Sequence, residues 1–167
     1  FRENTEDKTP NPAVLYMHGY SRTPSWLGEQ QIELLRLGYT VIGVDMRNYP
    51  PNIFPDYVYD MKGCIRYIRA HAAEFGVDPD KLGCCGQSLG GNGTLITGVT
   101  AWEPELEGTV GGNLDQSSRL QAISVGYGWS DLLYFGKDLT EEYKDYPEDI
   151  RKMKFENTDG PTAPAAE

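Results

Sequence analysis

The segment Gly86-Gln87-Ser88-Leu89-Gly90 restricts the possible folds of this 167-residue chain more than any other feature. A short apolar run at residues 81–85 precedes it, and a helical pattern of apolar and small residues at 89–99 follows it. A G-x-S-x-G pattern between a strand and a helix predicts a tight turn that holds the serine clear of the sheet edge. Gly86 and Gly90 suit such a turn, because a side chain there would collide with the neighbouring strand and helix.

Strand and helix patterns alternate along the rest of the chain. Short apolar runs predict strands at residues 13–17, 39–44, 81–85 and 120–125. Helical periodicity predicts helices at 26–37, 56–75 and 89–99, with a turn at 77–80 and an irregular excursion at 102–119. This order predicts an α/β fold, in which a mostly parallel sheet is covered by helices on both faces as a three-layer sandwich.

The expected organisation is a single folded core with two flanking segments. Residues 1–12 form an N-terminal segment, residues 13–135 the core, and residues 136–167 a charged surface segment and tail. Within the last segment, residues 140–154 are compatible with a surface helix, and the Pro- and Ala-containing end carries no core pattern.

Composition excludes some classes of function. The net charge of -10 and the pI near 4.6 disfavour a nucleic-acid partner, since basic residues are neither abundant nor clustered. No run of about 18 apolar residues predicts a membrane span. The start at Phe1 has no apolar signal segment, and the residues do not determine the compartment or the oligomeric state. An acidic surface is all that the charge establishes.

The three cysteines, Cys64, Cys84 and Cys85, have no spacing typical of a disulfide framework or a zinc site. We expect buried free thiols. A reactive thiol at Cys85, beside the glycine turn, is the alternative, but the sequence places no base near it.

Ser88 is the candidate nucleophile of this chain. The N–H of Leu89, at the start of the next helix, would face an oxyanion formed on an attacked carbonyl, and the helix dipole would favour that charge. Two alternatives stay open: Ser88 caps the helix through its hydroxyl, or the glycines at 86–93 form a phosphate-binding loop. Neither G-x-G-x-x-G nor G-x-x-x-x-G-K-[ST] fits the residues here, which weakens the second.

A second candidate element, His18-Gly19-Tyr20, follows the first predicted strand. A loop at this place can supply the second N–H of an oxyanion hole, and we assign that donor to the amide of Tyr20. The alternative is an ordinary turn at a strand end, with His18 as a structural histidine.

Several stretches together resemble an α/β-hydrolase of the esterase/lipase branch. They are His18-Gly19-Tyr20, Val44-Asp45-Met46-Arg47, Val77-Asp78-Pro79-Asp80, Gly86-Gln87-Ser88-Leu89-Gly90-Gly91 and Tyr127-Gly128-Trp129-Ser130-Asp131. The branch includes hormone-sensitive-lipase-like carboxylesterases and acetylxylan or feruloyl esterases, and the similarity covers residues 13–135. It implies a small-molecule or carbohydrate-linked ester substrate, an acyl-enzyme on Ser88, and no metal or organic cofactor.

The resemblance also implies an acid and a histidine after the serine, in that order. No histidine follows His71, so we expect a truncated hydrolase whose base lies outside these residues. Asp131 is expected to be a structural residue. Two other functions stay open: a non-catalytic binding module with this fold, and an amide hydrolase of the formamidase type.

Overall fold

The computed structural model describes residues 1–2, 9–19, 28–47 and 54–129. The chain divides into two compact units, Phe1–Gly128 and Trp129–Glu167, and the fold described below is that of the first. The predicted core boundary at residues 135/136, the surface helix at 140–154, Asp131 and Tyr20 all lie outside the described residues.

The first unit is built on a four-stranded parallel sheet. Its strands are β1 (Asn11–Met17), β2 (Thr40–Val44), β3 (Val77–Gln87) and β4 (Ala122–Gly126), in the order β2-β1-β3-β4. Each neighbouring pair is parallel. Because parallel strands place their carboxyl ends on one edge, the residues that follow Met17, Val44, Gln87 and Gly126 share that edge.

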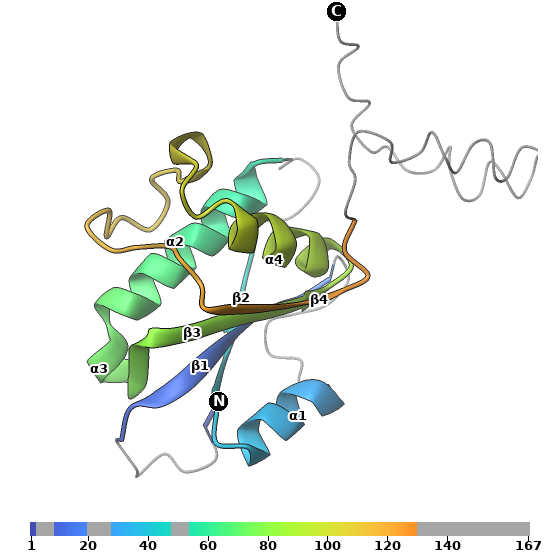
Figure 1. Cartoon of the computed structure of the whole chain (residues 1–167), viewed down its shortest axis with the longest axis vertical. Helices are drawn as coiled ribbons and strands as arrows, with labels where there is room; N and C mark the ends of the chain where they lie inside the picture. The colour runs from blue at the N-terminus through green and yellow to red at the C-terminus, as the bar shows by residue number, and fades with distance from the viewer. Residues whose placement is uncertain (3–8, 20–27, 48–53, 130–167) are drawn as a thin grey trace, which may run out of the picture. The chain divides into compact units, whose positions relative to one another are not determined.

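Helices cover both faces of this sheet (Figure 1). Helix α1 (Glu29–Arg36) lies on one face, whereas α2 (Asp56–Ala70), α3 (Ala72–Phe75) and α4 (Leu89–Val99) lie on the other. A short 3₁₀ turn, η1 (Pro104–Leu106), is part of the excursion between α4 and β4. The predicted α/β sandwich is therefore confirmed.

Successive side chains of β1 point to opposite faces of the sheet, so they belong to two separate hydrophobic clusters. Leu15 and Met17 join the cluster beneath α2, with Met61 and Ile65 of that helix. Tyr16, between them in sequence, joins the opposite cluster, where α1 packs. Burial on both faces explains why this strand is a continuous apolar run.

Two predicted elements need correction. The helix predicted at 56–75 is two helices, because the backbone leaves the helical region at His71 (φ -109°, ψ 22°). The turn predicted at 77–80 is part of β3, whose register with β1 jumps from Asn11↔Val77 to Ala13↔Leu82. The extra residues bulge out of the ladder, which is how a strand accommodates a proline such as Pro79 that has no N–H to donate.

The remaining elements differ from the prediction only at their ends. Helix α1 begins at Glu29, after the N-cap Gly28, and β4 begins two residues later than predicted. Helix α4 has the predicted bounds. Strand β4 is the outermost of the four on its side, and Ala122 through Val125 are exposed.

Candidate active site

Ser88 is the single residue between the end of β3 and the start of α4. Its backbone has φ 55° and ψ -122°, a conformation that residues with a side chain rarely adopt. The Ser88 N–H donates to the carbonyl of Gly126 over 2.9 Å, which ties the turn to the end of β4. The residue is exposed, and its side chain makes no capping hydrogen bond to α4. The hydroxyl is thus not used as the helix cap that the sequence left open.

The glycines around Ser88 are required by close backbone contacts. A Cβ built on Gly86 would lie 2.3 Å from the carbonyl oxygen of Gly90, and one built on Gly90 would lie 2.1 Å from that of Met17. Gly91, which lies outside the G-x-S-x-G pattern, is equally constrained: a Cβ built on it would lie 2.4 Å from the Gly126 oxygen. The run of glycines after Ser88 was the only sequence signal for this contact.

The residues after β1 lie directly beside the serine. A Cβ built on Gly19 would be 3.6 Å from the Cβ of Ser88. His18 is buried, with Nδ1 2.8 Å from the Gly19 oxygen and Nε2 3.3 Å from Oδ1 of Asp45, which follows β2. The ends of β1 and β4 therefore contact Ser88, and Asp45 at the end of β2 contacts His18. Tyr20 lies outside the described residues.

Leu89 is the first residue of α4 and is half-buried. The N–H groups in the first turn of a helix have no partner within the helix, and they carry the positive end of its dipole. The N–H of Asn92 donates to the Ser88 carbonyl over 2.9 Å, so the helical hydrogen bonding begins at the serine itself.

A comparison with known families identifies this arrangement. The family model described as BD-FAE matches residues 2–158. The chain belongs to the BD-FAE family. Its relatives and structural neighbours are esterases, which confirms membership in the esterase/lipase branch of the α/β-hydrolases.

Two curated relatives and two solved structures illustrate the similarity. The chain is 41% identical over 108 residues to the arylesterase of Saccharolobus solfataricus, covering 60% of this chain and 34% of that protein. It is 31% identical over 99 residues to the probable carboxylic ester hydrolase LipM of Mycobacterium tuberculosis, covering 59% of this chain and 22% of that protein.

Among solved structures, the chain is similar to Thermogutta terrifontis esterase 2 phosphonylated by cyclosarin. The TM-score is 0.69 and the identity 25%, with 82% of this chain and 53% of that chain covered. A truncated form of a carbohydrate esterase from gut microbiota gives a TM-score of 0.59 and 27% identity, covering 71% of this chain and 46% of that chain. The chain therefore spans 22–34% of these curated relatives and about half of these solved chains.

In this BD-FAE chain, a polar contact behind the serine joins α2 to α4. The Tyr57 hydroxyl donates to Oδ1 of the fully buried Asn92 over 2.7 Å. Burial raises the pKa of Tyr57 to about 12. No sequence pattern joins this pair, and the asparagine among the small and apolar residues at 89–99 was the available signal.

The chain's second histidine, His71, lies at the far end of α2. Tyr57, in the first turn, contacts the start of α4, and His71 follows it by 14 residues, about 21 Å along the helix axis. Its Nδ1 lies 2.9 Å from the Tyr67 oxygen, and its ring stacks on that of Tyr67 with centroids 4.1 Å apart. These contacts place His71 in the helix junction, away from Ser88.

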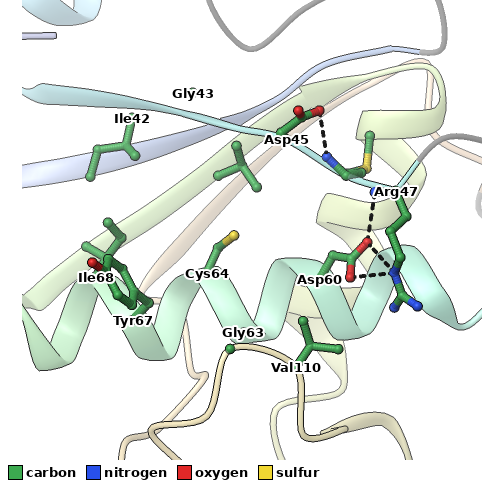
Figure 2. A pocket seen from close by; sticks show the side chains of 13 residues that line it. Ile42, Gly43, Asp45, Arg47, Asp60, Gly63, Cys64, Tyr67, Ile68 and Val110 are labelled. Atoms are coloured by element: carbon green, nitrogen blue, oxygen red, sulfur yellow. Dashed lines mark hydrogen bonds and ion pairs between the residues drawn. The ribbon is translucent and has the colours of Figure 1, made fainter.

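A cleft of about 670 Å³ lies between β2 and α2 and does not include Ser88 in its lining (Figure 2). Most of the lining is apolar, and its charged groups are Asp45, Arg47 and Asp60. Arg47 pairs with Asp60, its Nε lying 2.9 Å from Oδ1, and this hydrogen bond raises the pKa of Arg47. The charges of Arg47 and Asp60 are paired with each other, and none of residues 86–90 lines the cleft.

The cysteines are free thiols, as predicted. Cys84 and Cys85 are buried, and Cys64 is half-buried at the cleft. Burial raises the pKa of Cys64 to about 11 and raises the pKa of both other thiols. A thiol with a raised pKa carries little thiolate near neutral pH, so the alternative of a reactive thiol at Cys85 finds no support.

The described part of the chain contains neither a candidate metal cluster nor a candidate membrane span. No group of three or more His, Cys, Asp or Glu side chains there could hold a metal ion. None of the helices in those ranges is long and apolar enough to cross a membrane.

Proposed function

We propose that the protein carrying this chain is a serine carboxylesterase that acts on short acyl esters or carbohydrate-linked esters through an acyl-enzyme on Ser88. The observation that carries the proposal is the exposed Ser88, held at φ 55° between a strand and the N-terminus of a helix. Relatives named as esterases, and a similar structure named as a carbohydrate esterase, support the substrate class.

In the first half of the reaction, the Ser88 hydroxyl oxygen attacks the ester carbonyl and passes its proton to a general base. The carbonyl becomes a tetrahedral oxyanion, which receives hydrogen bonds from the N–H groups of Leu89 and Tyr20. The C–O bond of the ester then breaks, the alcohol leaves with the proton from the base, and the acyl group remains on the serine. Water frees it by the same steps in reverse order.

We assign the general base to a histidine outside these residues. Both nitrogens of His18 lie next to other groups, the Gly19 carbonyl and the Asp45 carboxylate. His71 lies one helix length away. A general base needs a ring nitrogen that is available and within hydrogen-bond reach of the serine. The first condition disfavours His18, and the second disfavours His71.

Labelling with a fluorophosphonate tests the nucleophile. This class of reagent phosphonylates an activated serine, and the similar Thermogutta terrifontis esterase 2 is phosphonylated by cyclosarin. We expect peptide mass spectrometry of the labelled protein to find the adduct on Ser88, and Ser88→Ala to abolish both labelling and hydrolysis of p-nitrophenyl acetate. Ser124→Ala, which changes another exposed serine, is the matched control and keeps both.

Two results would overturn the proposal. Hydrolysis that persists in the Ser88→Ala variant would exclude Ser88 as the nucleophile. A folded protein that is neither labelled nor active would favour the non-catalytic binding module. Parallel assays with acetylated xylan and with N-formyl amides distinguish an esterase from an amide hydrolase, and we expect activity on the ester only.

A further inference from the structure

Tyr127 is the neighbour of Ser88 on the adjacent strand. The last paired residues of β3 and β4 are Gln87 and Gly126, so Ser88 and Tyr127 are the residues with which the two strands leave the ladder. Neighbouring strands lie about 5 Å apart. Both residues have φ 55°, so the two strands turn away from the sheet with the same left-handed φ.

This backbone conformation is unusual for a tyrosine. Within the described ranges, the non-glycine residues with a positive φ are Ser88, Asn113 and Tyr127. Asparagine adopts such angles more readily than most residues, whereas a bulky side chain makes them a genuine outlier. The conformation of Tyr127 therefore costs free energy, as strained residues at functional sites commonly do.

The contacts around Tyr127 hold its backbone but leave its ring uncovered. A Cβ built on Gly91 in α4 would lie 2.4 Å from the Gly126 oxygen and 3.2 Å from the Gly128 nitrogen, so the residues on both sides of Tyr127 pack closely on the helix. Tyr127 itself is 85% exposed. Glycine would adopt this φ without strain, so the backbone does not explain the choice of a tyrosine.

We propose that Tyr127 is a specificity-determining residue, whose ring stacks on a flat ring carried by the alcohol part of the ester at Ser88. This rests on the proposed function. A short acyl group offers no ring to stack on, whereas the alcohol part of a carbohydrate-linked ester does. Tyrosine supplies a large and rigid contact area at a low cost in conformational entropy. The chemistry recognised is a flat face, which either a sugar or an aryl alcohol presents.

Three substitutions separate the ring from the backbone. Tyr127→Phe keeps the ring, Tyr127→Ala keeps only the backbone strain, and Tyr127→Gly removes both. The substrates share one acyl group: ethyl acetate has no ring, phenyl acetate has an aryl ring, and acetylated methyl xyloside has a sugar ring.

We expect Tyr127→Ala and Tyr127→Gly to raise KM about tenfold for an acetate with a ring, and Tyr127→Phe to keep the wild-type KM. The value of kcat changes little, because stacking stabilises the bound substrate and the transition state alike. None of the three should change kcat/KM for ethyl acetate. A loss on the xyloside alone, on phenyl acetate alone or on both identifies the ring that is recognised.

Trp102→Ala is the matched control, because Trp102 is another exposed aromatic residue, 72% accessible. It follows the far end of α4, about 16 Å from Ser88 along the helix axis. We expect this variant to keep the wild-type KM for all three substrates.

Three results would overturn the proposal. Equal KM values for Tyr127→Phe and Tyr127→Ala on both ring-bearing acetates would show that the ring is not used. An equal loss on ethyl acetate would show a general disturbance of the turn. A loss in Tyr127→Ala that Tyr127→Gly restores would assign the effect to backbone strain.

A measurement on the wild type covers the case in which the variants do not fold. Benzyl alcohol and methyl xyloside are added in turn to the full protein, and aromatic ¹H–¹³C spectra follow the ring of Tyr127. We expect one of the two to shift these signals and to leave those of Trp102 unchanged. Signals of Tyr127 that stay unchanged with both would overturn the proposal.

Fluorophosphonate labelling of the same sample keeps the two proposals apart. Absent labelling of Ser88, together with absent hydrolysis of all three acetates, rejects the esterase and with it this role of Tyr127. Labelling of Ser88 in a protein whose Tyr127 signals do not shift rejects only the role of Tyr127.

Discussion

Gly90, in the first turn of α4, lies against the carbonyl of Met17 at the end of β1. A Cβ on Gly90 would stand 2.1 Å from the Met17 oxygen and 2.6 Å from the His18 oxygen. Both neighbours are backbone atoms, one in the last residue of the central strand β1 and one in the residue that follows it, so neither can move without disturbing the sheet. This contact brings the loop after β1 up to Ser88.

Substitution of Gly90 by alanine is therefore expected to be severe. We expect Gly90→Ala to lower the free energy of unfolding by about 3 kcal/mol or more, since overpacking against backbone cannot relax. Gly38→Ala is the control, because Gly38 has φ 84° but nothing within 4 Å of the added Cβ. It should cost only the left-handed backbone penalty of about 1–2 kcal/mol. Equal losses in urea denaturation would contradict the steric explanation.

The strained backbone of Ser88 leads to a second expectation. Alanine at position 88 keeps the cost of φ 55°, whereas glycine removes it. The strain is worth about 1–3 kcal/mol, and the added freedom of glycine in the unfolded chain offsets about 0.4–1 kcal/mol. We expect Ser88→Gly to be more stable than Ser88→Ala by about 1 kcal/mol by chemical denaturation. A less stable glycine variant would show that the turn is not strained.

The bond between Tyr57 and Asn92 is expected to stabilise the packing of α2 on α4. Tyr57→Phe removes a hydroxyl that donates to a fully buried side chain, and it should cost about 1–2 kcal/mol of unfolding free energy. Tyr59→Phe is the matched control, because the Tyr59 hydroxyl donates at the exposed loop, to the Glu105 carbonyl over 3.0 Å. It should change stability by less than about 0.5 kcal/mol.

The contribution of Tyr57 should also depend on pH. Its pKa is raised to about 12 by burial in the folded state, whereas an unperturbed tyrosine titrates near 10. A raised folded-state pKa gives stabilisation that is complete below the unfolded pKa and is lost as the pH rises. The stability difference between the wild type and Tyr57→Phe should therefore shrink as the pH rises from about 10 toward 12. A constant difference would contradict this.

Glu107 compensates two fully buried cations of α2. Its carboxylate lies 3.4 Å from Nζ of Lys62, pairs closely with Nη1 of Arg66 and accepts the Ser118 hydroxyl over 2.8 Å. Removing one partner of a buried ion pair leaves an uncompensated charge, so Glu107→Gln should cost about 3–5 kcal/mol near pH 7. Glu105→Gln, at a neighbouring exposed carboxylate, should have little effect. Thermal unfolding of both variants provides the comparison.

The effect of Glu107→Gln should vanish in acid. Burial tends to raise the pKa of the Glu107 carboxyl, but the hydrogen bonds from Ser118 and Arg66 outweigh it and lower the pKa. A lowered folded-state pKa gives stability that is present above the unfolded value, about 4.3 for glutamate, and is lost as the pH falls through the folded value. A difference from the wild type that stays constant below this range would show that the carboxylate charge is not what stabilises the loop.

Local patterns were sufficient for most of the elements. Helix α4 begins and ends as its residues predict, because the turn before it and the apolar positions within it are both local signals. The break at His71 and the bulge at Pro79 were missed, since both depend on how α2, α3 and β3 pack on the sheet. Propensity alone does not report such contacts.

The candidate site shows the same division. Ser88 and its flanking glycines could be recognised from sequence, because the turn that holds them is defined by five consecutive residues. Tyr57 with Asn92, and His18 with Asp45, are 35 and 27 residues apart, and no local pattern joins them. The carboxyl edge of a parallel sheet is what brings His18 and Asp45 together.

The sequence by itself determined the α/β class, the candidate nucleophile and the need for glycine at positions 86 and 90, because each follows from periodicity or from steric limits within a few residues. Only the tertiary structure decided which residues meet around the serine and which groups lie next to the ring nitrogens of His18. The physical reason is that hydrogen bonds act over about 3 Å, a distance that only the folded chain sets between residues far apart in sequence.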